Sequence, residues 1–466
     1  MAISRRDLFE RGGLLALGTM AWPSWMPRMA FRRQDVGARG DVLVVVFARG
    51  GHDGLNMVIP FGEESTYYSL RRTIGIPAPD STAPNKAVDL DGFFGMHPSL
   101  ATSALGNWKQ WYDDGMLAIV HAMHMEDGTR SHFDAMDYME RGTPGEKQLN
   151  TGWLGRHLST MATQNNSPFR AVGMGTMLQA SLRGPVPAVA LQSIADFHLQ
   201  GRTDEILRFQ QHLQQLYGGT GWLDVEGQDT FKALDLLEEQ LGSDTYQPQH
   251  GARYVDTDGF HRGLKQIAQL IKADVGLEIA CIDIGGWDTH ANQVDGNNPA
   301  LGSQANLLNS LARGLDSFMT DLRDYWAEPG VTVVTMSEFG RRAGENGGRG
   351  TDHGHGNCMF VLGKGINGGQ VYTRPWPTLA PDALNQGDLA GTTEYRDVVG
   401  EILMRRVGNE KISEVFPAHS FNFLGLAKPR DVTVPTPAPS NTPEPTAIPT
   451  APAPQHKIYL PWGNKT

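Results

Sequence analysis

Short, mainly apolar runs recur along the chain, and longer segments of mixed polarity separate them. The first run covers residues 42–47 and consists of valine, leucine and phenylalanine. Consecutive apolar positions of this kind are typical of a strand that is buried on both faces, as in a parallel sheet. Similar runs occur at residues 115–123, 186–191, 276–286, 331–337 and 357–363.

The segments between these runs carry apolar residues at helical spacing. Such patterns occur at residues 131–142, 203–219, 229–242 and 304–326. Strands that alternate with helices predict an α/β fold, in which a doubly wound, mostly parallel sheet has helices on both faces. We predict one large domain of this kind over residues 40–427, which is long enough to bury a sizeable core.

Residues 1–30 have the features of a bacterial export signal. Arg5 and Arg6 precede a short, weakly apolar run, and the stretch SRRDLF resembles a twin-arginine signal. The run is too short to span a bilayer stably, so we expect no transmembrane domain in the mature chain. These features predict recognition by the twin-arginine export machinery and an extracytoplasmic location. The alternative is an ordinary basic helix start.

The composition of the chain changes near the C-terminus. Residues 428–455 are rich in proline and threonine, which predicts a disordered and extended linker. Residues 456–466 regain apolar character. One interpretation is that this tail attaches the protein to the cell envelope, and the other is that it is a floppy end.

Overall charge and cysteine content exclude two classes of protein. The formal net charge is −11 and no stripe of lysine and arginine is visible, so we expect no nucleic-acid partner. The two cysteines, Cys281 and Cys358, both lie in apolar runs. Two buried thiols are therefore expected, and not a disulfide framework.

Acidic and histidine side chains follow several of the predicted strands. Because strand ends in such sheets gather on one rim, we expect these side chains to share a site. Carboxylates and imidazoles are ligands for zinc, manganese and magnesium, so the sequence predicts one or two divalent metal ions. The candidate ligands are Asp53, Asp288, His290, Glu338, Asp352, His353 and His355. Each has a simpler interpretation as a turn former, a helix cap or a solvated loop residue.

Arg130 and Ser131 stand where a predicted helix begins. A serine at a helix N-terminus can attack a phosphorus while the helix amides hold the anionic oxygens, and a nearby metal lowers the pKa of its hydroxyl. An arginine beside it can bind two phosphate oxygens at once. These residues therefore predict catalytic roles in hydrolysis of a phosphate or related anionic ester. The alternative is that Ser131 only caps the helix, as the first residue of a Ser-x-x-Asp capping box.

Six motifs occur in a characteristic order along the chain: VVVFARGGHDGLN, GMHPSL, RSHFDA, GWDTHANQ, SEFGRR and DHGHGN. Together they resemble a large bacterial family of exported proteins known as domain of unknown function 1501, over residues 40–427. That family is in turn similar to the alkaline phosphatase-like superfamily, which includes phosphatases, sulfatases and cofactor-independent phosphoglycerate mutases.

The resemblance to this superfamily implies a role for each matching residue. Asp53 would lie between two metals, Ser131 would be the nucleophile, and Asp288 with His290 would hold one metal. His353 or His355 would supply a late histidine. The chain departs from the superfamily at Glu338-Phe339, where relatives usually carry Asp-His. Either the metal set is altered, or the loop that contains Asp352 supplies the missing ligand.

The residues and the resemblance together predict an exported metal-dependent hydrolase that acts on a small anionic ester. A second hypothesis comes from a different class of protein. On it, the chain is a non-catalytic extracytoplasmic binding or assembly protein that keeps the same fold.

Overall fold

The computed structural model describes residues 40–101, 107–161, 165, 167–194, parts of 212–236, 246–327 and 330–430. The predicted export signal, nearly all of the predicted linker and the C-terminal tail lie outside the described residues. Much of the predicted helices 203–219 and 229–242 does so too. Among the described residues, no helix combines the length and the apolar character that crossing a membrane requires.

The described strands form one large sheet and one small one. The strands are β1 Val42–Ala48, β2 Val58–Ile59, β3 Val88–Asp89, β4 Gly95–Met96, β5 Leu117–His124, β6 Ala171–Met174, β7 Val189–Leu191, β8 Ile279–Ile284, β9 Val331–Met336, β10 Asn357–Leu362, β11 Gln370–Tyr372 and β12 Thr393–Glu394. The large sheet has the order β11-β5-β10-β9-β1-β8-β6-β7, with β12 beside β5. The small one has the order β2-β4-β3.

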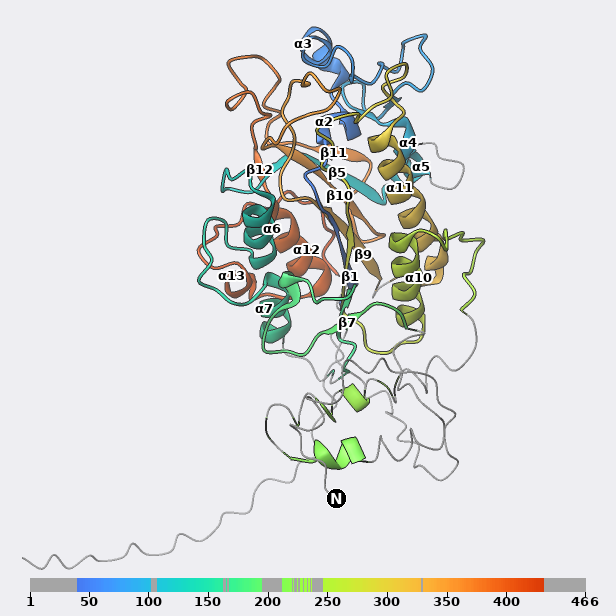
Figure 1. The fold of residues 1–466 in the computed structure, drawn as a ribbon, viewed down its shortest axis with the longest axis vertical. Coiled ribbons are helices and arrows are strands. Elements are labelled where there is room, and N and C mark those ends of the chain that lie inside the picture. The colour runs from blue at the N-terminus through green and yellow to red at the C-terminus, as the bar shows by residue number, and fades with distance from the viewer. Residues whose placement is uncertain are drawn as a thin grey trace, which may run out of the picture. The chain divides into compact units, whose positions relative to one another are not determined.

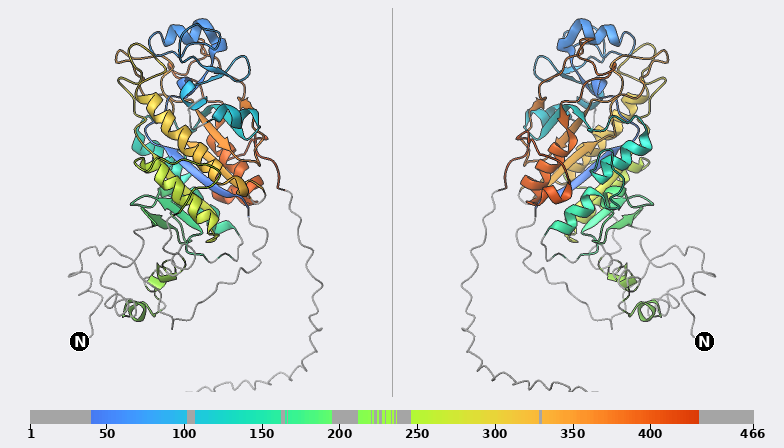
Figure 2. Two further views of the ribbon diagram at one scale, coloured as in Figure 1. Left: turned by 90° about the vertical axis from the view of Figure 1, so that its right-hand side faces the viewer. Right: turned by 90° about the vertical axis from the view of Figure 1, so that its left-hand side faces the viewer.

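The helices that matter for the sheet flank it on both faces. They are α2 Gly54–Met57, α3 Glu64–Leu70, α4 Pro98–Ala101, α5 Trp108–Asp113, α6 His132–Arg141, α7 Trp153–Thr160, α10 Gly259–Lys272, α11 Ser303–Asp321, α12 Tyr395–Ile402 and α13 Ile412–Val415. Helices α10 and α11, with α4 and α5, cover one face, and α6, α7, α12 and α13 cover the other (Figure 1; Figure 2). The predicted doubly wound, mostly parallel α/β fold is confirmed.

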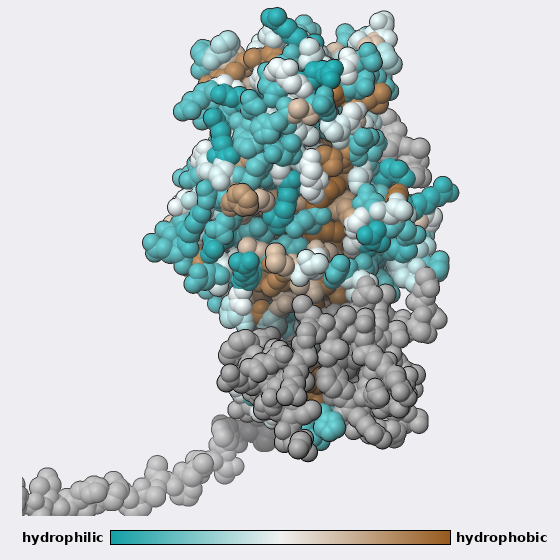
Figure 3. All heavy atoms as spheres, viewed as in Figure 1, coloured by the Kyte–Doolittle hydropathy of each residue, from teal (hydrophilic) through white to brown (hydrophobic). Residues whose placement is uncertain are grey.

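Two apolar cores explain this layering. Alternate residues of β1 point to opposite sides, so Val42, Val44 and Val46 belong to one core, and Leu43 and Val45 belong to the other. A central strand of a sheet that is covered by helices on both faces must therefore be apolar at every position, as residues 42–47 are. On the face shown in Figure 3, hydrophilic side chains cover the helices, and apolar side chains gather in a band between the two helix layers.

The strands predicted from the apolar runs all exist, as β1, β5, β7, β8, β9 and β10. The predicted helices at residues 131–142 and 304–326 are α6 and α11. The apolar pattern did not predict helix α10. It also did not predict strand β6, because β6 has only four residues and includes a glycine.

Strand direction brings the ends of five strands to one edge of the sheet. Strands β8 and β9 both run parallel to β1. Strand β10 runs antiparallel to β9 and to β5, so β5 is parallel to β9. The carboxyl ends of β1, β5, β8 and β9 therefore meet the amino end of β10. The polar segments that follow or precede these strands face one another for this reason.

The glycine-rich segment between β9 and β10 is a tight reversal of the chain. The Gly340 amide donates to the His355 oxygen at 3.0 Å, and the Gly354 amide donates to the Gly340 oxygen at 2.9 Å. A Cβ atom at Gly340 would lie 1.9 Å from the Gly356 oxygen, which is well inside van der Waals contact. Only glycine at this position lets the two arms approach closely enough to return His353 to the sheet edge.

We expect Gly340→Ala to destabilise the protein by about 1–3 kcal/mol, because the added methyl group must push the two arms apart. Thermal unfolding followed by circular dichroism measures the loss. Gly347→Ala in the same segment is the matched control, since nothing lies within 4 Å of a Cβ atom there. Equal melting temperatures for the two variants would contradict the close-approach explanation.

Four of the buried histidines in the described part of the chain are held in the neutral form. Burial lowers the pKa of His52 and of His121 to about 4, and the pKa of His97 and of His157 to about 3, from an ordinary value of 6.5. The unfolded chain therefore takes up protons below pH 6.5 that the native protein does not bind. Stability that is present above pH 6.5 must then be lost as the pH falls toward 4.

We expect the melting temperature, measured with a metal chelator present, to fall steadily between pH 6.5 and pH 5. Most carboxylates are still ionised in this window, so the buried histidines dominate the effect. Scanning calorimetry across the window measures the slope, and His157→Gln should make it shallower. A melting temperature that does not change across the window would refute this origin of acid sensitivity.

Candidate metal centre

Four side chains converge at the end of the sheet where β1, β5, β8 and β9 finish and β10 begins. His353 Nε2 lies 2.9 Å from His132 Nε2 and 2.9 Å from His290 Nε2. Asp288 Oδ1 lies 3.1 Å from His290 Nε2, 3.2 Å from His353 Nε2 and 3.4 Å from His132 Nε2. We call His132, Asp288, His290 and His353 the four-ligand cluster.

The histidines of the cluster reach this point from different segments. His132 is the first residue of α6, His290 lies in the segment after β8, and His353 lies in the reversal before β10. The aromatic ring of Phe339 packs against His132 and His353, with centroids 4.8 and 4.9 Å apart. This packing limits the orientations of both imidazoles.

Every histidine of the cluster has a hydrogen-bond acceptor on its other ring nitrogen. Nδ1 of His132 lies 2.7 Å from Glu338 Oε1, and Nδ1 of His290 lies 3.0 Å from Asp352 Oδ1. Nδ1 of His353 lies 2.9 Å from the backbone oxygen of Arg130. An acceptor at Nδ1 places the proton there, so each Nε2 presents a lone pair to its neighbours.

Three lone pairs and a carboxylate oxygen that face one another repel unless a cation lies between them. Two nitrogen ligands of one zinc ion, each about 2.1 Å from it in a tetrahedral arrangement, lie about 3.4 Å apart. Within the group His132, Asp288 and His353, whose ligand atoms all lie within 4.8 Å of one another, the separations of 2.9 to 3.4 Å are close to this value. His290 lies 2.9 Å from His353 and 3.1 Å from Asp288, beside this group. The donor set suits zinc, whereas magnesium prefers oxygen ligands. The residues of the cluster therefore fit a divalent metal ion.

Asp288 is held in its ionised form by a buried arginine. Partial burial opposes ionisation, but the hydrogen bond from Arg341 Nη2, at 2.7 Å, and its charge lower the pKa of Asp288 to about 2. The guanidinium of Arg341 also donates to the backbone oxygens of Gly50, Gly51 and Trp287. It thus ties the ends of β1 and β8 together behind the cluster.

Glu338, a predicted ligand, lies one step behind the cluster. Its side chain is fully buried and accepts from the Gly50 amide at 2.8 Å as well as facing His132. Burial raises the pKa of Glu338, but the hydrogen bonds with His132 and with backbone amides, including that of Gly50, together outweigh it, so the net pKa is lowered. That hydrogen bond in turn raises the pKa of His132. Glu338 therefore orients an imidazole of the cluster.

Asp352 has the equivalent position behind His290. Its Oδ1 accepts from Asn346 at 3.0 Å and lies 3.0 Å from His290 Nδ1. The hydrogen bond from Asn346 and then that from His290 lower the pKa of Asp352. The ionised carboxylate fixes the tautomer of His290, as acidic partners of metal-bound histidines do in other proteins.

The structure places Asp53 and His355 outside the cluster. Both oxygens of Asp53 are bonded to the guanidinium of Arg71, at 2.6 and 2.9 Å, and this pair is fully buried. His355 instead packs beside His124, with ring centroids 5.1 Å apart. The expectation that these two side chains join the metal ligands thus differs from the observed geometry. Among the described residues, His132, Asp288 and His353 form the group of such side chains whose ligand atoms all lie within 4.8 Å of one another, and it contains neither Asp53 nor His355.

Ser131 and Arg130 flank the cluster at the start of α6. Ser131 is the N-cap residue, and its Oγ accepts from the Asp134 amide at 3.4 Å. Arg130 donates from Nη2 to Asp388, while its backbone oxygen accepts from His353. The capping interpretation of Ser131 is therefore observed. Since capping uses only an acceptor lone pair, the hydroxyl hydrogen stays available for another partner.

His132 is the member of the cluster that was not among the predicted metal ligands. It lies in the motif RSHFDA, directly after the serine that attracted the catalytic interpretation. The sequence signal for His132 as a ligand was its place at the start of a predicted helix, in one of the polar segments that follow the predicted strands. The motif supplies a ligand from the residue next to the predicted nucleophile.

Solvent can reach the cluster. The exposed side-chain fractions are 46% for Asp288 and 43% for His290, against 24% for His353 and 20% for His132. A metal site with only structural function is usually closed by protein ligands and buried, whereas a catalytic one keeps an open position. The exposed fractions of Asp288 and His290 leave the cluster open to solvent, as at a site that keeps an open position.

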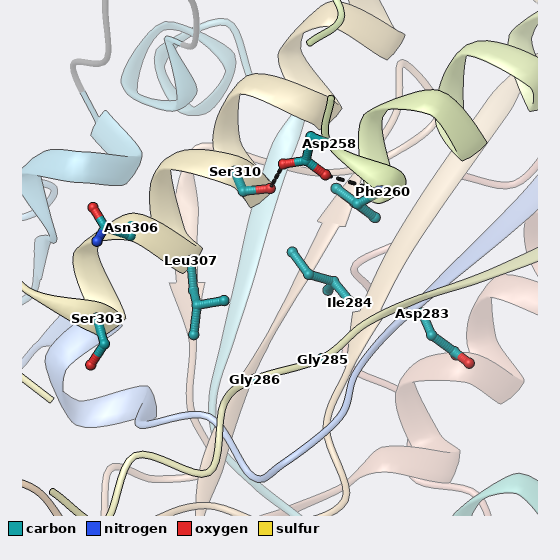
Figure 4. Close-up of a pocket in the computed structure, with 10 residues that line it drawn as sticks. All are labelled: Asp258, Phe260, Asp283, Ile284, Gly285, Gly286, Ser303, Asn306, Leu307 and Ser310. Atoms are coloured by element: carbon teal, nitrogen blue, oxygen red, sulfur yellow. Dashed lines mark hydrogen bonds between the residues drawn. The ribbon is translucent and has the colours of Figure 1, made fainter. Parts of the chain in front are cut away.

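A separate pocket of about 520 Å³ lies at the end of β8, between the N-terminal parts of α10 and α11 (Figure 4). Asp258 caps α10 there and accepts from Ser310 Oγ at 2.5 Å. Phe260, Ile284 and Leu307 supply apolar lining. The lining contains no histidine and no member of the four-ligand cluster, so the candidate chemistry lies at the cluster.

Comparisons with known proteins identify the family. The family model described as "Protein of unknown function (DUF1501)" matches residues 41–395. The chain belongs to this family. The DUF1501 match runs from the start of β1 to the end of β12, and it includes every member of the four-ligand cluster. No curated protein sequence matches this DUF1501 chain.

Several solved structures show a distant likeness to this DUF1501 chain. The C-terminal periplasmic domain of EcEptC from Escherichia coli, in complex with zinc, is 11% identical; the alignment covers 77% of this chain and 85% of that chain, with a TM-score of 0.31. An alkaline phosphatase from an Antarctic bacterium is 10% identical, over 70% of this chain and 92% of that chain, with a TM-score of 0.26. The 2-O GAG sulfatase BT1596 is 12% identical, over 72% and 66%, with a TM-score of 0.26. At these TM-scores the likeness carries no argument about activity.

We expect Glu338→Gln to weaken zinc binding by about 10- to 100-fold, because the neutral amide no longer fixes and polarises His132. Titration of the purified protein against a fluorescent zinc chelator measures the affinity. Glu401→Gln is the control, since Glu401 is equally buried but interacts with the backbone amides of residues 424, 425 and 427 and with Arg405, away from the four-ligand cluster. Unchanged zinc affinity in Glu338→Gln would remove Glu338 from its supporting role.

Proposed function

We propose that this chain is an exported, metal-dependent hydrolase of a phosphate or related anionic ester. The observation that carries the proposal is the set of three imidazole Nε2 atoms and one carboxylate oxygen that converge at a solvent-accessible edge of the sheet. The residues that would hold the metal are His132, Asp288, His290 and His353. A divalent cation bound there would polarise an ester oxygen and lower the pKa of a neighbouring hydroxyl.

The start of α6 supplies the other groups that such a reaction needs. Ser131 Oγ would attack the phosphorus or sulfur atom, the alcohol would leave, and water would then release the anion from the serine. The backbone amides of His132 and Phe133 would hold the anionic oxygens, because amides in the first turn of a helix have no carbonyl partner within it and the third one, that of Asp134, is capped by Ser131. Arg130 would bind the same anion through its guanidinium.

The proposed setting of the reaction follows from the ends of the chain. Residues 1–30 would direct the folded protein through the twin-arginine export machinery, which places the site outside the cytoplasm. The C-terminal tail, residues 456–466, would attach the protein to the cell envelope. Edman sequencing of the secreted protein tests the first point, and release of a tail-deleted variant from the envelope tests the second.

A second candidate function has one specific observation in its favour. Within the described part of the chain, Ser131 Oγ caps α6 and interacts with Asp134, and it makes no hydrogen bond with a member of the four-ligand cluster. A cluster that binds metal without a nucleophile nearby would suit an extracytoplasmic metal-binding or assembly protein. The substitutions below separate the two functions.

We expect Ser131→Asn to abolish hydrolysis of p-nitrophenyl phosphate and bis-p-nitrophenyl phosphate while leaving bound zinc unchanged. Asparagine is as good an N-cap as serine, so α6 should keep its stability even though the nucleophile is lost. Ser131→Thr, which keeps a hydroxyl, is the matched control and should retain part of the turnover.

Two results would count against the proposal in different ways. Turnover that survives in Ser131→Asn would show that another group is the nucleophile. A wild-type protein that holds zinc but hydrolyses none of the phosphate or sulfate esters, even with added zinc, manganese or magnesium, would favour the binding function.

A further inference from the structure

Two arginines flank one side of the four-ligand cluster. The backbone oxygen of Arg130 accepts from His353 Nδ1 at 2.9 Å. The backbone amide of Arg342 donates to the Asp352 oxygen, also at 2.9 Å. Each arginine is thus one hydrogen bond away from a residue that forms or supports the cluster.

The two guanidinium groups share one buried carboxylate. Arg130 Nη2 donates to Asp388 Oδ2, and Arg342 Nη1 lies 3.5 Å from Asp388 Oδ1. The Asp388 side chain is 1% exposed, whereas those of Arg130 and Arg342 are 38% and 37% exposed. Two cations on one anion leave one unit of positive charge at the surface.

This arrangement differs from an ordinary ion pair elsewhere in the same chain. Arg405 has a side chain that is 35% exposed and pairs with the fully buried Glu401. That pair has one cation for one anion and is therefore neutral. Around Asp388 two partly exposed guanidinium groups share one buried carboxylate, and Arg342 also interacts electrostatically with Asp352.

The arginines also have donors to spare. Within the described residues, Nε and Nη1 of Arg130 and Nε and Nη2 of Arg342 make no hydrogen bond. A guanidinium presents its N–H groups as a flat fork, which matches two oxygens of a tetrahedral oxyanion. Asp388 holds Nη2 of Arg130, and the backbone oxygen of Gln386 holds Nη1 of Arg342, which also forms an ion pair with Asp388. Because one end of each fork is held in this way, the remaining donors lose little conformational freedom when they bind.

We propose that Arg130 and Arg342 together form a binding site for the tetrahedral oxyanion of the substrate, beside the metal ligands, and that Asp388 positions both. The substrate class is a phosphate or sulfate ester whose free oxygens face two guanidinium groups. The inference rests on the proposed function for the identity of the substrate. Binding of the free oxyanion needs no turnover, so the two can fail separately.

The experiment measures binding of inorganic phosphate, and in a second arm inorganic sulfate, to the full-length zinc-loaded protein by isothermal titration calorimetry. We expect Arg342→Gln and Arg130→Gln each to weaken binding of the preferred anion by about tenfold or more, because each removes charge-assisted hydrogen bonds. Zinc content should not change. Arg405→Gln is the matched control and should bind the anion as the wild type does.

Asp388→Asn tests the positioning role with the same measurement. We expect weaker anion binding with both arginines still present, and circular dichroism shows whether this buried substitution leaves the fold intact. The arginine substitutions at partly exposed positions keep the inference testable if Asp388→Asn does not fold.

The possible outcomes separate the inference from the proposed function. Anion binding that depends on Arg130 and Arg342 in a protein without esterase activity would support the site and contradict the enzyme. Preference for sulfate over phosphate would support the site and assign sulfate esters as the substrate class. No anion binding by the zinc-loaded wild type, or equal binding by Arg342→Gln and wild type, would overturn the inference.

Discussion

The hydrogen bond on the outer nitrogen of each imidazole is the interaction on which the rest of the centre depends. His132, His290 and His353 each have an acceptor at Nδ1, so their Nε2 lone pairs must face inward. Without those acceptors the rings could turn, or place protons between one another, and no cation would be required. The supporting acceptors are Glu338, just after β9, Asp352, farther along the β9–β10 segment, and the Arg130 oxygen, just before α6. The centre therefore depends on several segments at this end of the sheet.

Direction of a single strand explains why the acceptors and the ligands meet. Strand β10 is antiparallel in a sheet whose other described pairings are parallel. A parallel β10 would begin at the far edge, and the segment before it would deliver His353 there. The segment between β9 and β10 returns to the same end of the sheet, since the antiparallel β10 starts near the point where β9 ends.

The fold was predictable from the sequence because burial on both faces leaves a plain pattern in the central strands. Runs such as residues 331–337 have no polar face to confuse with a surface helix, and they predicted β9 and its neighbours. The strand ends were predictable for the same reason, and with them the approximate place of Asp288, His290 and His353.

Roles at the site were harder to assign, since a carboxylate that binds a metal and one that supports an imidazole have the same sequence signal. Glu338 and Asp352 belong to the second kind in the geometry. The buried pairing of Asp53 with Arg71 depends on where α3 ends, which no local pattern specifies.

The ligands of the cluster come from three stretches that are far apart along the chain: the start of α6, the segment after β8 and the reversal before β10. An ion bound by all of them would act as a cross-link that joins distant parts of the polypeptide, much as a disulfide does. Such a link restricts the unfolded chain more strongly than the folded one, and the effect grows with the length of chain that it encloses. Because the two cysteines are buried and free, the chain has no covalent link of this kind. A bound metal would then be a reversible link between these three stretches. Its loss would loosen this end of the sheet before it loosened the core.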